Sequence, residues 1–404
     1  MSQENYYRPY RWVVLAAFMV VAGVNQMLWL NFVPLLSEIQ SKYNVSETLA
    51  STLILCFPLL YVILSMHSGA MTDRKGYRFT VGLGAATMAV FSLARIYTDS
   101  FYALLIGQVG IAVAQPYILN GITKLSADWF AVEHRALATG LGTAGMFTGM
   151  ALGLALSPSL NESYGLTTTM IIFAAITIVC SGFFLIAAKE NHKTEPDEMA
   201  QMRSFTASSE LLQLLKDPAI ALVTLIGFLA LGFFNGLTTW FEGLLGENGI
   251  DPVQAGLVGG VMILGGILGS LIIPAISDMT KRRKPYLVFC GISGLLLTMP
   301  LVTGTNITMV YVFGGLLGFL FLPGYALLLA MSEELAGAER AGGAAGALMM
   351  AGNAGAVIIA AAMDAIRSDT SGWRPAEYLL MAVLVVILGL AFFTRESFRT
   401  TPDA

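Results

Sequence analysis

Polar side chains able to bind a small cation lie inside apolar stretches of this 404-residue chain. Two indole rings, Trp29 and Trp240, offer ring faces that attract an ammonium group, a contact worth about 0.5–2 kcal/mol. Three amides, Asn25, Gln115 and Asn353, lie within a few residues of the middle of their stretches. Because polar groups are costly in hydrocarbon, these five residues are the candidate substrate-binding residues. They suit a quaternary ammonium group or another small amphipathic solute.

The stretches that carry these residues are long enough to cross a membrane. The chain is 56% hydrophobic and 12% charged, with a mean hydropathy of +0.72, which excludes a water-soluble domain of this size. Runs of about 18 to 25 apolar residues each cover roughly 30 Å of hydrocarbon. We therefore predict an all-α membrane protein with twelve transmembrane helices, at 12–35, 48–69, 79–97, 101–124, 136–158, 167–188, 219–241, 253–276, 286–304, 308–331, 341–364 and 376–393.

The basic residues predict the orientation of these helices. With the N-terminus inside, 18 of the 22 Lys and Arg residues lie on inner segments, and the outer segments hold Lys42, Arg95, Arg367 and Arg374. Lys and Arg are retained on the cytoplasmic side, so both termini are predicted to be cytoplasmic, in a bacterial plasma (inner) membrane. The net charge of −4 is separated across the membrane and forms no basic surface for nucleic acid.

A repeated segment indicates that the chain is duplicated. The sequence from Gly69 to Arg78, which contains Asp73, lies between spans two and three, and a similar segment ends at Asp278, 205 positions after Asp73. Each half has an even number of spans, so both copies enter the membrane in the same orientation. The predicted architecture is two pseudo-symmetric six-helix bundles.

One long polar segment separates the two predicted bundles. It covers residues 189–217, between an N-terminal bundle at 1–188 and a C-terminal bundle at 218–404. Within it, Ser208 to Lys216 has a cap residue followed by leucines at helical spacing. A short helix on the inner membrane surface and a simple tether are both open interpretations.

The repeated segment resembles the signature of the major facilitator superfamily, Gly-x-x-x-Asp-Arg-x-Gly-x-Arg, which is matched here at Gly69, Asp73, Arg74, Gly76 and Arg78. The resemblance covers essentially the whole chain and implies an alternating-access carrier. A glycine at the end of span two allows a close helix approach, and a carboxylate favours the positive N-terminus of another helix.

In the superfamily's fold that helix is span eleven, which begins here at 341–343. The segment, with Asp278 in its second copy, is therefore interpreted as a conformational latch. For Arg74, Lys75 and Arg78, an alternative role as topology anchors is preferred.

A narrower likeness is to the feline leukaemia virus subgroup C receptor-type carriers, which are associated with choline, ethanolamine and haem-related transport. It rests on Asn25-x-x-x-Trp29, on the segment from Gly107-Gln108 to Gln115, and on Asn235 with Trp240. The resemblance implies a site formed by Trp29, Gln115, Trp240, where the family has Tyr, and Asn353, where it has Gln. Both departures keep the chemical type and change the size.

Each candidate residue also has a structural interpretation. Buried Asn and Gln often bridge helices, as expected for Gln108. Trp240 lies near the outer interface, where tryptophans form a belt.

Small-residue faces are predicted to let helices touch backbone to backbone in span five, at Gly140, Gly142, Gly145, Gly149 and Gly153, and in span eleven, at Gly342, Gly346, Gly352 and Gly355.

Few charged groups are available to couple transport to protons. Glu242, Asp364 and Asp128 are predicted near span ends, where a solvated carboxylate costs little. Arg95 is similarly placed and could equally attract an anion. Facilitated diffusion is therefore the leading hypothesis. The alternative is a proton-coupled exporter or importer of another metabolite or drug, with a relay through Glu242.

Other functional classes lack their sequence signatures. The three cysteines and three histidines are scattered, so neither a metal site nor a disulfide framework nor a cofactor is predicted. No paired catalytic motif of an intramembrane enzyme occurs. A transport-inactive receptor or sensor would need a larger signalling segment than the 29-residue linker. The expected partners are a small-molecule substrate and the lipid bilayer, with the chain as a monomer.

Overall fold

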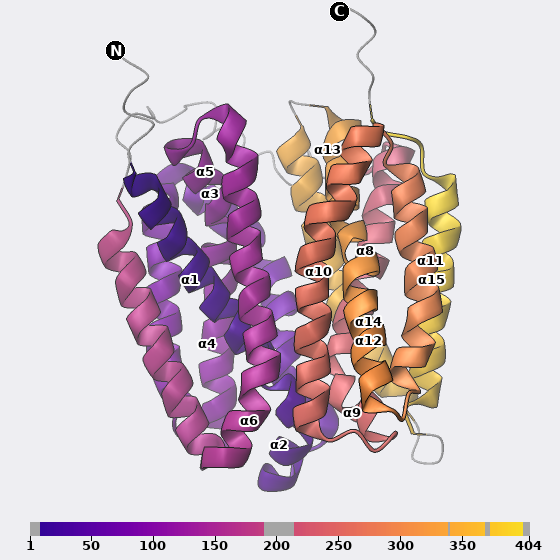
Figure 1. The fold of residues 1–404 in the computed structure, drawn as a ribbon. Coiled ribbons are helices and arrows are strands. Elements are labelled where there is room, and N and C mark those ends of the chain that lie inside the picture. The colour runs from indigo at the N-terminus through magenta and orange to yellow at the C-terminus, as the bar shows by residue number, and fades with distance from the viewer. Residues whose placement is uncertain (1–8, 190–213, 338–339, 368–371, 399–404) are drawn as a thin grey trace, which may run out of the picture. The chain divides into compact units, whose positions relative to one another are not determined.

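The computed structural model describes residues 9–189, 214–337, 340–367 and 372–398, whose regular elements are helices (Figure 1). The chain divides into two compact units, Met1–Thr206 and Ala207–Ala404. The helix suggested for the linker begins at Ser208, outside the described residues, and the described chain resumes at Leu214.

The helices of each unit follow in chain order. The first unit contains α1 (Tyr10–Leu30), η2 (Val33–Leu35), α2 (Leu36–Tyr43), α3 (Glu47–Ala94), α4 (Phe101–Leu119), α5 (Gly121–Trp129) and α6 (Val132–Ala187). The second contains α8 (Pro218–Thr239), α9 (Phe241–Gly246), α10 (Pro252–Thr280), α11 (Lys284–Val302), α12 (Ile307–Phe321), α13 (Pro323–Ala336), α14 (Ala341–Ile366) and α15 (Arg374–Phe393).

Two helices of the first unit are each long enough for two membrane crossings. α3 has 48 residues and α6 has 56, so at 1.5 Å per residue each would be at least roughly 70 Å long if straight. Each is interrupted at a glycine with positive φ, Gly76 at 80° and Gly165 at 76°. Among the described residues, ten helical stretches are long and apolar enough to span a membrane. Dividing the two interrupted stretches at these glycines makes this consistent with the twelve predicted spans.

The order of elements is repeated in the two units. In each, the first long helix is followed by a short one, α2 in the first unit and α9 in the second. In each, the fourth span is broken, between α4 and α5 at Asn120 and between α12 and α13 at Leu322. This shared order fits the duplication that the sequence predicts.

Small residues bring helices together within each unit. A β-carbon added at Gly149 of α6 would overlap the carbonyl oxygen of Gly23 in α1, and one at Gly355 of α14 would overlap that of Phe228 in α8. The predicted small-residue faces thus mediate close packing on α6 and α14. They do not do so along their whole length, because no described atom lies within 4 Å of a β-carbon added at Gly140, Gly342 or Gly346.

Candidate functional site

The side chain of Trp29 in α1 packs against α3. Its ring is 7% exposed and stacks on Phe57 of α3, with ring centroids 6.1 Å apart and an interplanar angle of 23°. The indole Nε1 donates to the carbonyl oxygen of Ile54 at 3.1 Å. Because the N–H is already satisfied, the ring face is the part of this side chain left for contact with a ligand.

Asn25 connects three helices. Its Nδ2 lies 3.4 Å from the carbonyl oxygen of Ile111 in α4 and 3.7 Å from the sulfur of Met88 in α3. Its Oδ1 accepts from Nε2 of Gln26 at 3.2 Å, and the side chain is fully buried. This arrangement favours the interpretation of Asn25 as a residue that bridges helices.

The side-chain oxygen of Gln115 lacks a hydrogen-bond donor among the described residues. The side chain is 3% exposed, and its Oε1 has no hydrogen-bond partner among the described residues. Gln108 also has an unpartnered Oε1, but its Nε2 donates to the carbonyl oxygen of Leu28 at 2.9 Å and so bridges α4 to α1, as predicted. A buried amide oxygen without a donor is costly, which makes Gln115 the amide in this unit best suited to receive a ligand hydroxyl.

The pairing of α1 with α4 fixes the spacing of these three residues. Asn25 lies opposite Ile111 and Leu28 lies opposite Gln108, so the two helices run antiparallel. Trp29 is one turn from Asn25 toward the end of α1, and Gln115 is one turn from Ile111 in the opposite direction. The candidate residues of the first unit therefore extend over about two turns, roughly 12 Å along the helix axes.

The candidate residues of the second unit make their hydrogen bonds within that unit. Trp240 is 1% exposed, donates to the carbonyl oxygen of Ala360 at 2.9 Å and packs against Trp373 with ring centroids 5.0 Å apart. Its burial does not fit an interfacial belt. Asn353 is partly exposed, and its Nδ2 donates to the carbonyl oxygen of Met349 at 2.9 Å. Asn235 is buried and makes the equivalent bond within α8.

Two charged residues predicted to be solvated are buried instead. Glu242 is 6% exposed in the first turn of α9, and Arg95 is 1% exposed at the end of α3. Both predictions were wrong: Glu242 lies in a further helix, α9, beyond the predicted span, and Arg95 contacts Asn31, next to α1, and Met170 of α6. Asp128 does lie at a helix end and pairs with Lys124 at 3.5 Å.

A polar network that the sequence does not predict holds the break between α4 and α5. Asn120 lies at the break, where its Oδ1 accepts from the Tyr61 hydroxyl at 2.9 Å. Its Nδ2 lies 2.6 Å from Oγ of Ser68 and 3.2 Å from the carbonyl oxygen of Ser65. In the sequence, an Asn after the Pro116-containing turn could have indicated a polar residue at a helix break. Its partners on α3, however, are more than 50 residues away, so the sequence does not identify them.

The first copy of the repeated segment turns the chain between the two parts of α3. Gly76 takes the positive φ that this turn requires, which explains the second glycine of the motif. Asp73, Arg74 and Arg78 are exposed. A β-carbon added at Gly69 would meet no atom of the first unit within 4 Å, so the close helix approach predicted at that glycine is not made within this unit and stays a prediction.

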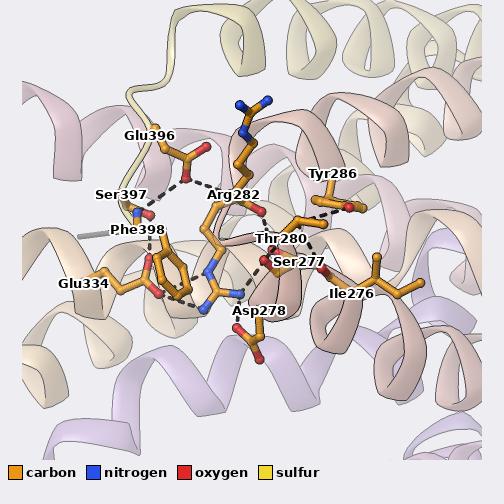
Figure 2. A network of polar contacts seen from close by, with 11 residues as sticks. Ile276, Ser277, Asp278, Thr280, Arg282, Tyr286, Glu334, Glu396, Ser397 and Phe398 are labelled. Atoms are coloured by element: carbon orange, nitrogen blue, oxygen red, sulfur yellow. Dashed lines mark hydrogen bonds and ion pairs between the residues drawn. The ribbon is translucent and has the colours of Figure 1, made fainter. Parts of the chain in front are cut away.

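The second copy is built differently, around Arg283. Its guanidinium pairs with Asp278 at 2.5 Å and with Glu334 of α13 at 2.8 Å, and its Nη1 lies 3.2 Å from Oγ of Ser277. Opposite charges favour protonation, so the pKa of Arg283 is raised despite its burial. Figure 2 shows Glu334 and Asp278 on either side of this guanidinium.

The segment after α15 completes this network. Glu396 accepts from the backbone N–H groups of Arg283 and Lys284, at 2.7 and 3.2 Å, at the start of α11. Ser397 donates to Glu334 at 2.6 Å, and the ring of Phe398 lies 5.1 Å from the guanidinium carbon (Figure 2). The network thus joins α10, α11, α13 and the C-terminal segment within one unit.

Comparison with known proteins decides the family. The family model described as Major Facilitator Superfamily matches residues 18–298 and 238–404. The chain belongs to the Major Facilitator Superfamily. It is therefore an integral membrane transporter and not an enzyme, and its all-helical fold is the one that the sequence predicts.

Relatives within this superfamily carry different names. An uncharacterized protein of Archaeoglobus fulgidus is 32% identical over 225 residues, 56% of this chain and 97% of that protein. The zebrafish (Danio rerio) solute carrier family 49 member A3 is 27% identical over 69% of this chain, and the match spans only 61% of that protein's length. The choline/ethanolamine transporter FLVCR1 of Mus musculus is 25% identical over 97% of this chain and 76% of its own length.

A solved structure shares the fold. The crystal structure of a bacterial homolog of the human lysosomal transporter Spinster, inward-facing and unoccupied, matches with a TM-score of 0.74. It covers 98% of this chain and 100% of the other at 14% identity, so the likeness concerns the fold of the superfamily alone.

Proposed function

We propose that this superfamily member is an alternating-access carrier of a small organic cation with a hydroxyl group, of the choline or ethanolamine class. The observation that carries the proposal is that two buried groups of the first unit, about two helical turns apart, suit the two ends of such a solute: the indole ring of Trp29 and the Gln115 amide oxygen, which has no donor among the described residues. The names of the FLVCR1-type relatives support the same class.

Each candidate residue has a proposed role. The ring face of Trp29 attracts the ammonium group, and Oε1 of Gln115 accepts a hydrogen bond from the hydroxyl. Asn25 holds α1 against α3 and α4, so that both ligand-binding groups keep their places. Trp240 and Asn353 are proposed to serve the same ligand from the second unit.

The conformational latch remains a proposal for Asp73. Its carboxylate is exposed, and we propose that it binds the N-terminus of α14, which begins at Ala341, when the cytoplasmic side is closed. Both termini are proposed to be cytoplasmic, in a bacterial inner membrane, with the chain as a monomer.

Facilitated diffusion is the proposed mode of transport, and proton coupling through Glu242 is the alternative. The burial of Glu242 is the observation that favours the alternative, since a buried carboxylate is a candidate proton carrier. Solute uptake into vesicles with an imposed pH gradient distinguishes them. Accumulation driven by the gradient, and lost in Glu242→Gln, would overturn the facilitator proposal.

Thermal unfolding of the purified protein tests the substrate class. We expect choline and ethanolamine to raise the Tm, and sugars, amino acids and haem to leave it unchanged. Trp29→Ala should abolish the response. Trp12→Ala, in the same helix but 39% exposed, is the matched control and should keep it. Stabilisation by a sugar or carboxylate alone, undiminished in Trp29→Ala, would contradict the proposal. Binding without transport would indicate the receptor or sensor alternative.

A further inference from the structure

A buried arginine of the first unit lacks hydrogen-bond acceptors. Nη2 of Arg95 donates to Oδ1 of Asn31 at 3.0 Å and lies 3.3 Å from the sulfur of Met170. Its Nε and Nη1, and Nδ2 of Asn31, are buried with no partner among the described residues. Two side chains bonded to each other thus present three unsatisfied donor nitrogens in one place.

The charge of this guanidinium also lacks a counter-ion. Arginine stays protonated in proteins, and a buried charge is costly unless it is paired. Among the described residues, no carboxylate lies within 4.0 Å of Arg95. The ring of Phe32, 4.6 Å away, and the C-terminus of α1 at Leu30 offer partial negative charge, but they leave the three donors unsatisfied.

The surrounding packing limits what can bind there. A β-carbon added at Gly107 would lie 2.6 Å from Cγ of Arg95, so the aliphatic part of this side chain packs tightly against α4. On the side of α6, Nη2 of Arg95 contacts the Met170 thioether, which is a weak acceptor on a flexible side chain. A ligand that reaches the guanidinium from this side would have to replace the Met170 sulfur, which lies 3.3 Å from Nη2.

We propose that Arg95, Asn31 and the movable side chain of Met170 form a binding site for a small monovalent anion of the size of chloride. The anion would take the place of the Met170 sulfur beside Nη2, accept from Nη2 and from the unsatisfied donor on the same edge of the guanidinium, and neutralise the buried charge. Because α1, α3 and α6 meet at these three residues, binding would stabilise the first unit. The inference does not depend on the substrate proposed for the carrier.

Thermal unfolding of the purified full-length protein in sodium chloride, compared with sodium gluconate at equal ionic strength, tests the site. Gluconate has the same charge but is too large to replace the Met170 sulfur. We expect a saturable rise in Tm of about 2–4 °C that is specific to chloride or bromide. Equal Tm values in the two salts would overturn the proposal and leave ordered water as the partner of the donors.

Two variants separate anion binding from a general loss of stability. Asn31→Asp places a fixed carboxylate beside Arg95, so it should raise the Tm in gluconate and remove the response to chloride. Arg374→Gln, which changes an exposed arginine of the second unit, should keep the full response. A chloride response that persists in Asn31→Asp, or that Arg374→Gln abolishes, would contradict the assignment.

Discussion

The two copies of the repeated segment use their matching carboxylates, Asp73 and Asp278, differently. In the first unit, Asp73 is exposed and, within the described residues, makes no ion pair inside 4.0 Å. In the second, Asp278 pairs with Arg283, which also binds Glu334 and contacts Phe398. The first copy leaves its carboxylate exposed, and the second uses its carboxylate in an ion pair within its own unit.

This difference shows that a duplicated motif does not imply a duplicated role. The first copy has the positive-φ glycine, Gly76, and exposed charges on both sides of the turn. The second copy ends in a left-handed Lys281 and is closed by Glu396 from the end of the described chain. The first copy therefore suits a contact that forms and breaks, and the second suits a permanent one.

The largest expected effect is on the second copy. Arg283→Met removes a buried cation and leaves Glu334 and Asp278 without their ion-pair partner, so we expect the free energy of unfolding to fall by about 3 kcal/mol. Denaturant or thermal unfolding of the purified protein measures this. Arg282→Met removes the same charge from an exposed neighbouring position and should change stability by less than about 0.5 kcal/mol. Equal losses in the two variants would show that the network does not stabilise this unit.

A smaller effect on stability is expected at the close helix contacts made by small residues, which both units contain. Gly149→Ala places a methyl group against the carbonyl oxygen of Gly23, and we expect this overpacking to cost about 1–3 kcal/mol. Gly346→Ala lies in open space on α14 and should be neutral or slightly stabilising. Unfolding measurements that give the reverse order would contradict the helix contacts described here.

The smallest effect on stability is expected at the first copy. Asp73→Asn should change the free energy of unfolding by less than about 0.5 kcal/mol, because the side chain is exposed. Transport, however, should fall about 5- to 10-fold if the carboxylate stabilises one conformation through a helix N-terminus. Asp278→Asn should show the opposite pattern, with a larger loss of stability than of transport. A transport rate in Asp73→Asn equal to that of the unchanged protein would remove the latch proposal.

The fold was largely predictable because membrane crossing imposes length and apolar composition on each helix. The spans at 253–276 and 286–304 fall within or close to α10 and α11. Hydropathy does not register a turn made by one glycine, so the positive φ of Gly76 and Gly165 was not foreseen. Nor does hydropathy show that Glu242, in the first turn of α9, is buried, since that depends on packing between helices.

The residue types of the candidate site could be predicted from the sequence, but the hydrogen-bond partners of these residues could not. The costs of polar groups in hydrocarbon identified Trp29 and Gln115 as candidates. Which of the amides would be satisfied by other helices depends on helix register, and this separates Asn25 from Gln115. In the same way, the four cations of 281–284 look alike in sequence, yet Arg283 is the one whose side chain is buried against Glu334.

The most direct test of the account is uptake of radiolabelled choline into liposomes that contain the purified protein. We predict saturable uptake that stops when the concentrations inside and outside are equal, is competed by ethanolamine, and is lost in Trp29→Ala but retained in Trp12→Ala. Uptake no greater than in protein-free liposomes, or uptake undiminished by Trp29→Ala, would contradict the proposed function.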